Sequence, residues 1–194
     1  DKVYALPNLR AAFAKVKANA GAAGVDRQTI EMFERHLEAN LQKLSAELRS
    51  GQYRPRPVRR HWIPKPGKAG EQRPLGIPTV RDRVAQAAVR HVIEPIYEKD
   101  FAAHSYGFRP QRGCKDALRR VSELLRQGYT WVVDADLKSY FDTIPHQPLM
   151  ERVRQKVSDG RMLDLIQAYL DQPILDELTQ WTPEGGTPQG AVLS

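Results

Sequence analysis

The sequence predicts an α+β fold, because segments with helical spacing of apolar residues surround one proline-rich basic segment and one short apolar segment. Six prolines between residues 53 and 78 exclude a long helix in that segment. Residues 129–136 (YTWVVDAD) are rich in aromatic and β-branched side chains, which favours a strand. Hydrophobic residues make up 41% of the chain and charged residues 27%, values typical of a globular protein.

Each expected element follows from its own local signals. Apolar residues recur at helical spacing in six segments, and capping residues, glycines or a proline mark several of their ends. The predicted helices are 8–19, 29–50, 79–94, 114–126, 147–157 and 161–171. The segments VRRHWI and RPLGI predict two short strands that form a basic hairpin around the loop PKPGKAGEQ. The residues after 171 are expected to form a loop or a hairpin.

Positive charge is concentrated in one window. The net charge is +7, and the window from Arg54 to Arg73 holds seven basic residues against one acidic residue, a balance of +6. A basic stripe of this kind is typical of a surface that binds a phosphate backbone, and Arg56, Arg59 and Arg60 are the candidate contacts. A solvated, well-charged loop would have the same composition, so charge alone leaves both interpretations open.

Composition excludes several other classes of protein. The chain has one cysteine, Cys114, and its five histidines are scattered, which excludes an intrachain disulfide and a cysteine-rich zinc site. No apolar run approaches the ~18 residues that a membrane span needs, so no membrane partner is expected. A single cysteine fits a reducing compartment, and we expect the protein in the cytoplasm.

The predicted strand at 129–136 ends in two carboxylates. Side chains alternate along a strand, so Val132, Asp134 and Asp136 would share one face. Two carboxylates beside apolar residues are costly to bury without a positive partner, and a divalent metal ion is one such partner. A strand end that turns into solvent would explain the same residues, and this pair alone does not decide between them.

Further blocks surround this strand in a fixed order. They are Gly24-Val-Asp26, Arg73-Pro-Leu-Gly-Ile-Pro78, Ser105-Tyr-Gly-Phe-Arg-Pro110, Asp136-Leu-Lys-Ser-Tyr-Phe-Asp142 and Thr187-Pro-Gln-Gly190. In this order they closely resemble the reverse transcriptases encoded by bacterial group II introns, and the resemblance covers essentially the whole chain. Retron and CRISPR-associated reverse transcriptases share several blocks, so the subclass stays open.

The resemblance implies a polymerase right-hand fold with mostly helical fingers, a basic hairpin and the first part of an antiparallel palm sheet. It divides the chain into a first part of the fingers (1–88), a first part of the palm with the catalytic strand (89–143), and a return to the fingers with the start of a second palm segment (144–194). The Tyr-x-Asp-Asp block of the family is expected after this segment.

The resemblance also implies roles for single residues. Asp136 matches the aspartate that holds both Mg²⁺ ions of a two-metal phosphoryl transfer, with the backbone carbonyl of Leu137 as a further ligand. Asp134 is not a standard ligand in the family. Residues that match the nucleotide-binding positions are Lys65, Arg73, Phe141 and Gln189. Lys65 and Arg73 would grip the triphosphate, and Phe141 would be the steric gate under the sugar.

Two further arginines are candidates for the template path. Arg81 and Arg109 could contact nucleic acid, but an ion pair for Arg81 and packing of the loop for Arg109 explain them equally well. Structure has to decide between these alternatives.

The implied activity is an RNA-directed DNA polymerase of a bacterial group II intron, which copies RNA into DNA by Mg²⁺-dependent nucleotidyl transfer. Its partners would be an RNA template and primer, deoxynucleoside triphosphates and its own intron RNA. The segment alone is expected to be inactive, because one ligating aspartate cannot build a two-metal site. A non-catalytic RNA-binding or splicing-assisting (maturase) module on the same scaffold is the main alternative. A viral-type RNA-dependent RNA polymerase is disfavoured by Phe141 and by the Pro-Gln-Gly block.

Overall fold

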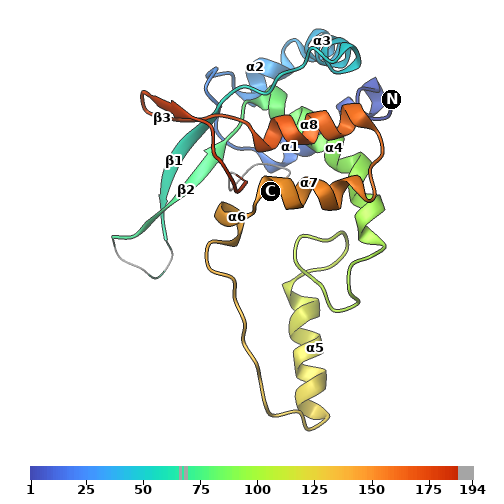
Figure 1. The fold of residues 1–194 in the computed structure, drawn as a ribbon, viewed down its shortest axis with the longest axis vertical. Helices are drawn as coiled ribbons and strands as arrows, with labels where there is room; N and C mark the ends of the chain where they lie inside the picture. Colours follow the sequence, from blue (N-terminus) through green and yellow to red (C-terminus); the bar gives the residue numbers. More distant parts are fainter. Residues whose placement is uncertain (66, 68–69, 188–194) are drawn as a thin grey trace. The chain divides into compact units, whose positions relative to one another are not determined.

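The computed structural model describes residues 1–65, 67 and 70–187, and it confirms the α+β fold (Figure 1). The chain forms two compact units, which comprise residues 1–93 with 139–194 and residues 94–138. The assignment of the ranges 1–88, 89–143 and 144–194 to fingers and palm remains a prediction. Within the described residues, no helix is long and apolar enough to cross a membrane.

Helices form the core of the first unit. They are α1 (Leu6–Asn19), α2 (Ile30–Glu34), α3 (Leu37–Ser50) and α4 (Val80–Glu98). Phe13 of α1 stacks on Phe33 of α2 with ring centroids 5.6 Å apart. The prediction of one helix over 29–50 was wrong, because the backbone leaves the helical conformation at His36 (φ −123°, ψ 36°). The predicted end of α4 at residue 94 was also wrong, since the helix continues through Pro95.

The predicted basic hairpin is present. Strands β1 (Val58–Pro64) and β2 (Gln72–Ile77) pair in antiparallel register, with Arg60 opposite Gly76 and Ile63 opposite Arg73. Two short strands, β3 (Ile174–Asp176) and β4 (Thr179–Trp181), extend it to a sheet with the order β2-β1-β3-β4. The parallel pairing of β3 with β1 joins segments more than a hundred residues apart, and local sequence signals do not reveal it.

The chain returns to the first unit through three helices. They are α6 (Tyr140–Thr143), α7 (His146–Arg154) and α8 (Gly160–Leu170). Helix α8 begins with a side-chain cap, in which Asp159 accepts a hydrogen bond from the Met162 N–H at 2.8 Å. At its other end Tyr169 is buried and meets the Tyr53 ring edge-on, 6.2 Å between centroids. This contact fixes α8 against the base of the hairpin.

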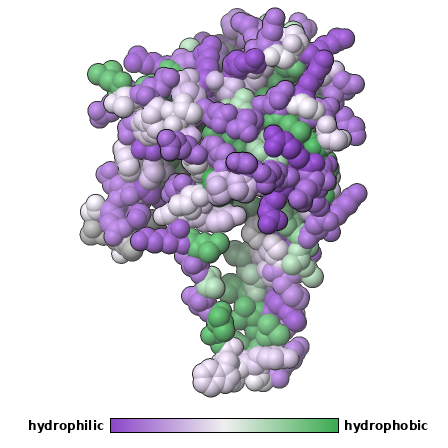
Figure 2. Space-filling view, in the orientation of Figure 1, coloured by the Kyte–Doolittle hydropathy of each residue, from purple (hydrophilic) through white to green (hydrophobic). Residues whose placement is uncertain are grey.

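The second unit contains α5 (Cys114–Arg126), as predicted, and the segment 129–137. The prediction of a strand over 129–136 was wrong, since these residues form no strand and all are exposed. A strand needs a neighbour for its backbone hydrogen bonds, and none of the described residues pairs with this segment. Helix α5 also buries no residue, and its Leu118, Val121 and Leu125 are exposed. Figure 2 shows apolar side chains gathered in the part of the view where Figure 1 draws α5.

Candidate functional site

Two residues from blocks predicted to flank the same site, Phe141 and Thr187, lie side by side in the first unit. The Thr187 N–H donates a hydrogen bond to the Phe141 carbonyl at 2.7 Å, and the Gly186 N–H donates one to the Ile144 carbonyl at 2.8 Å. The ring nitrogen Nε2 of His146 lies 2.7 Å from the Gly186 carbonyl oxygen. Residues 185–187 are therefore docked on the segment that carries Phe141.

The close fit requires a glycine at position 186. Its φ of +79° lies in the left-handed region, and a Cβ placed there would be 2.6 Å from the Asp142 carbonyl oxygen. Gly186 is also buried. The predicted nucleotide-binding residue Gln189 follows two positions after Thr187 but lies outside the described residues.

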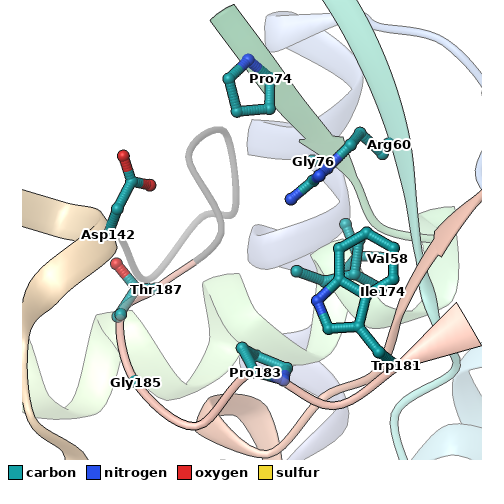
Figure 3. A pocket seen from close by; sticks show the side chains of 11 residues that line it. Val58, Arg60, Pro74, Gly76, Asp142, Ile174, Trp181, Pro183, Gly185 and Thr187 are labelled. Atoms are coloured by element: carbon teal, nitrogen blue, oxygen red, sulfur yellow. The ribbon is translucent and has the colours of Figure 1, made fainter. Parts of the chain in front are cut away.

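A pocket of about 260 Å³ opens next to this docked segment (Figure 3). Figure 3 shows Asp142 and Thr187 on one side of the pocket, and Arg60 and Trp181 on the other. The lining residues come from the sheet, from α6 and from the segment after β4: Val58, Arg60, Pro74, Gly76, Asp142, Ile174, Trp181, Pro183, Gly185, Gly186 and Thr187. The pocket combines an apolar floor with one cation and one carboxylate, a lining that suits a polar ligand with an apolar part.

Arg60 is held in this wall by two aromatic rings. Its guanidinium carbon lies 4.6 Å from the Trp181 ring centroid and 5.3 Å from the Trp62 ring centroid. Asp176 adds an ion pair at 3.9 Å. Stacking on aromatic faces leaves the in-plane N–H donors of a guanidinium available for other acceptors.

The two predicted triphosphate contacts lie on the hairpin but do not line the pocket. Lys65 forms an ion pair with Glu71 at 2.9 Å, and its backbone N–H donates to the Glu71 carbonyl. Arg73 is exposed and makes no side-chain hydrogen bond or ion pair with a described residue. Because side chains alternate along paired strands, Arg73 and its partner Ile63 project from the face opposite Arg60 and Gly76.

Two further cations of the basic stripe, Arg56 and Arg59, bind other parts of the protein. Arg56 pairs with Asp26 at 3.2 Å, while about half of its side chain stays exposed. Arg59 donates to the Ala23 carbonyl at 2.7 Å, and its buried Nε has no partner among the described residues. These contacts attach β1 to the loop that carries the Gly24-Val-Asp26 block.

Arg81 and Arg109 also make internal contacts. Arg81 forms an ion pair with Glu47, and its guanidinium lies 4.6 Å from the centroid of the Tyr53 ring. In the second unit, Arg109 donates to both carboxylate oxygens of Glu98 and to two backbone carbonyls of the loop before it. The structure thus shows the ion pair considered for Arg81 and the loop packing considered for Arg109. Contact with nucleic acid stays a prediction for both residues.

The predicted metal ligand Asp136 belongs to the second unit. Asp134, Asp136 and Leu137 are all exposed in the segment without secondary structure. Across the part of the chain that the structure describes, no three histidine, cysteine, aspartate or glutamate side chains are grouped so that they could hold a metal ion. Asp136 therefore stays a predicted ligand, and a two-magnesium centre needs further ligands besides it.

Sequence reasoning missed part of this site. Trp62 and Trp181 were not singled out, although both contact Arg60. Asp142 was considered only as part of the Asp136–Asp142 block, and its place in the pocket lining was not predicted. Alternation along β1 could have placed Trp62 on the face of Arg60. The position of Trp181 depends on the pairing of β3 with β1, which carries no local signal.

Comparison with known proteins decides the family. Residues 63–194 match the family described as reverse transcriptase (RNA-dependent DNA polymerase). The chain belongs to the reverse transcriptase family. The resemblance seen in the sequence blocks is thereby confirmed at the level of the family.

Curated relatives agree with this assignment. This reverse transcriptase chain is 43% identical over 179 residues to the protein YkfC of Escherichia coli (strain K12), a match that covers 90% of the chain and 46% of YkfC. It is 38% identical over 185 residues to the group II intron-encoded protein LtrA of Lactococcus lactis subsp. cremoris, with 94% of the chain and 30% of LtrA covered. The chain thus spans less than half the length of these relatives.

A solved structure has the same fold. A chain of the assembly titled "Partial Cas6-RT-Cas1--Cas2 complex" superimposes with a TM-score of 0.62 at 22% identity, and the match covers 99% of this chain and 31% of that chain. At this identity the likeness supports the polymerase-type fold of the reverse transcriptase and nothing more specific.

Proposed function

We propose that this chain is the nucleotide-binding part of an RNA-directed DNA polymerase encoded by a group II intron, which copies RNA into DNA. The observation that carries the proposal is the hydrogen bond from the Thr187 N–H to the Phe141 carbonyl. It joins two blocks, 46 residues apart, that the family places around the incoming nucleotide. Homology to a group II intron-encoded protein supports the intron subclass.

In this proposal each residue acts on one part of the deoxynucleoside triphosphate. Phe141 packs against the sugar, and its exposed fraction of 38% leaves ring surface for that contact. Lys65 and Arg73 bind the phosphates, Lys65 as a point charge and Arg73 as a bidentate donor. Arg73 has no ion pair with a described residue to give up, whereas Lys65 has to leave Glu71. Gln189 is proposed to contact the nucleotide on the family resemblance alone.

Magnesium is the proposed cofactor, with Asp136 and the Leu137 carbonyl as ligands. The described residues do not fit a two-magnesium centre by themselves, because Asp136 is one exposed carboxylate with no acidic cluster around it. When bound, the ions would activate the primer hydroxyl and neutralise charge on the leaving pyrophosphate. The chain 1–194 on its own is accordingly expected to be inactive.

The proposed partners are an RNA template with its primer and the intron RNA that encodes the protein, in a bacterial cytoplasm. The net charge of +7 and the basic stripe support binding of a phosphate backbone. Of the candidate contacts Arg56, Arg59 and Arg60, Arg56 has the most exposed side chain, with about half of it exposed, so it is the first candidate for such a contact.

A second function is supported by the name of one further relative. The chain is 32% identical over 95 residues to the protein named nuclear intron maturase 2, mitochondrial, of Arabidopsis thaliana. A maturase role would use the same scaffold to bind intron RNA without synthesis of DNA. It requires the basic surface but neither Asp136 nor Phe141.

Primer extension by the full-length protein on an RNA template, with Mg²⁺ and deoxynucleoside triphosphates, tests the proposal. We expect extension by the unchanged protein, and loss of extension with retained intron RNA affinity for Asp136→Asn. A protein that extends no primer but accelerates splicing of its intron would establish the maturase role instead. Extension that survives Asp136→Asn would overturn the assignment of the metal ligand.

A further inference from the structure

Three side chains form a stack on one face of the sheet, with Arg60 in the middle. Arg60 and Trp62 alternate with Arg59 and His61 along β1, so they project from the same face. Trp181 reaches this face because it pairs with Ile174, which in turn pairs with Val58. The Arg60 guanidinium is thereby placed between the two indole rings, 5.3 Å from one and 4.6 Å from the other.

The two tryptophans of the stack differ in exposure. Trp181 is partly buried and lines the pocket of Figure 3 together with Arg60. Trp62 is 43% exposed, although a large aromatic side chain gains most from burial. Packing on Arg60 thus accounts for only part of the ring of Trp62, and the exposed part can accept another planar group.

Trp62 borders a second hollow on the sheet, with a volume of about 710 Å³. Its walls are β1, the loop at residues 23–27, and β3 with the first residue after it. It is lined by three arginines and a histidine, Arg27, Arg59, Arg60 and His61, and by two acids, Asp176 and Glu177. Asp176 is already paired with Arg60, which leaves a net positive lining.

The basic lining has donor capacity left over. Arg59 uses its terminal nitrogen for the Ala23 carbonyl and its Nε is buried, so it adds positive charge to the hollow and not a donor for a ligand. Arg27 makes no side-chain hydrogen bond or ion pair with a described residue. Phosphate oxygens are acceptors that match such donors. The negative charge of Glu177 would repel phosphates, so we expect them near Arg27.

We propose that Trp62 is a stacking platform for an unpaired base of single-stranded RNA, with an adjacent phosphate bound by Arg27. An exposed indole next to guanidinium groups is the combination that binds single strands, because every base has a π-face and every nucleotide a phosphate. A duplex keeps its bases stacked on each other, so this site selects single strands. The proposal takes nucleic acid as the ligand from the proposed function.

Binding of a short oligouridylate, and of an abasic oligomer with the same number of phosphates, to the full-length protein tests the platform. We expect the unchanged protein to prefer the oligouridylate, and Trp62→Ala to lower its affinity for that oligomer about tenfold, as loss of one stacked base does. Affinity for the abasic oligomer should stay unchanged, because the phosphate contacts remain. Trp62→Leu, which keeps an apolar side chain but no π-face, should behave like Trp62→Ala, and Trp62→Phe should restore part of the preference.

Trp181→Ala is the matched control, since it removes the other ring that holds Arg60. If Trp62 served only to hold Arg60, both variants would weaken both oligomers alike, and that result would overturn the proposal. An unchanged preference for the oligouridylate in Trp62→Ala would overturn it too. Primer extension by the unchanged protein is measured in parallel. A lack of extension would count against the polymerase assignment, whereas the stacking platform is tested only by the preference for the oligouridylate.

Discussion

The Tyr53 hydroxyl donates a hydrogen bond of 2.6 Å to the buried carboxylate of Asp82. The same carboxylate accepts hydrogen bonds from the Thr79 hydroxyl at 2.8 Å and from the Arg56 backbone N–H at 3.0 Å. Asp82 thus ties the start of α4 to the segment that leads into β1. The basic hairpin is oriented by this buried cluster at its base.

Removal of the Tyr53 hydroxyl should destabilise the first unit in a pH-dependent way. Burial raises the pKa of Asp82, and the hydrogen bond from Tyr53 opposes this effect. Because the pKa of Asp82 is higher in the folded state than in the unfolded state, the folded protein holds this proton more tightly. The free energy of unfolding therefore falls as pH rises through the raised pKa. Without Tyr53 the pKa rises further, so Tyr53→Phe should cost about 1–3 kcal/mol, and more at high pH than at low pH.

Thermal melting of the full-length variant at about pH 5 and about pH 8 measures this difference. Tyr169→Phe is the control, because the Tyr169 hydroxyl donates to Tyr53 over a longer distance, 3.3 Å, and does not reach Asp82. It should cost less and show a weaker dependence on pH. Equal losses of Tyr53→Phe at both pH values would contradict the coupling to Asp82.

Gly186→Ala should disrupt the docking of residues 185–187. The new Cβ would lie 2.6 Å from the Asp142 carbonyl oxygen, and alanine at a φ of +79° costs about 1–2 kcal/mol by itself. Because the docked segment leads into the block that contains Gln189, we expect the KM for deoxynucleoside triphosphates to rise together with a lower melting temperature. Steady-state primer extension measures the KM.

Gly185→Ala provides the comparison in the same segment. Its Cβ would lie 3.3 Å from the Ile144 carbonyl oxygen, and Gly185 does not have a positive φ. A shift of a few tenths of an ångström relieves that contact, so the KM should change little. If both alanine variants behave alike, the positive φ and the close approach at Gly186 do not control the site.

Local signals predicted those parts of the fold whose contacts are close in sequence. The hairpin of β1 and β2 and the helix α5 depend on neighbouring residues, and both were predicted. The break at His36 and the continuation of α4 through Pro95 depend on packing, which overrides local preference. The strand predicted from YTWVVDAD failed for a related reason, since residue composition cannot supply the neighbouring strand.

In the candidate site, too, contacts between residues that are distant in sequence could not be predicted. The family resemblance singled out Phe141 and the block that begins at Thr187, and the structure places Phe141 and Thr187 in contact. It could not show that Arg59 is bound to Ala23 or that Arg60 lies between two tryptophans, because these partners come from distant segments. Charge counting predicts a basic stripe but not which of its cations remain free for a ligand.

Asp136→Asn and Asp134→Asn should separate catalysis from stability. Both carboxylates are exposed in the second unit, so neither substitution removes a buried interaction. We therefore expect unchanged melting temperatures for both variants of the full-length protein. Primer extension should fall by several orders of magnitude for Asp136→Asn, as loss of a metal-ligating charge predicts, and far less for Asp134→Asn. Equal losses would mean that the metal ligand is misassigned.

Phe141 is predicted to make the enzyme choose deoxynucleotides over ribonucleotides. A ring packed against the C2′ atom of the sugar leaves no room for a 2′-hydroxyl, and displacement of the sugar moves the α-phosphate out of line. A displacement of ~1 Å can lower the rate about a hundredfold. The discrimination should therefore appear mainly as lost turnover on ribonucleotides and less as lost binding.

The structure makes Phe141→Val a clean test of this gate. The ring is 38% exposed and contacts the Tyr140 ring edge-on, 5.5 Å between centroids, so its truncation opens no enclosed cavity. The contact with Thr187 uses the backbone carbonyl of Phe141, which valine retains. We expect ribonucleotide incorporation to rise about tenfold or more, a modest fall in deoxynucleotide turnover and a nearly unchanged melting temperature. If Phe141 instead holds α6 in place, both activities would fall together with the melting temperature, and the ratio of the two kcat/KM values would not change.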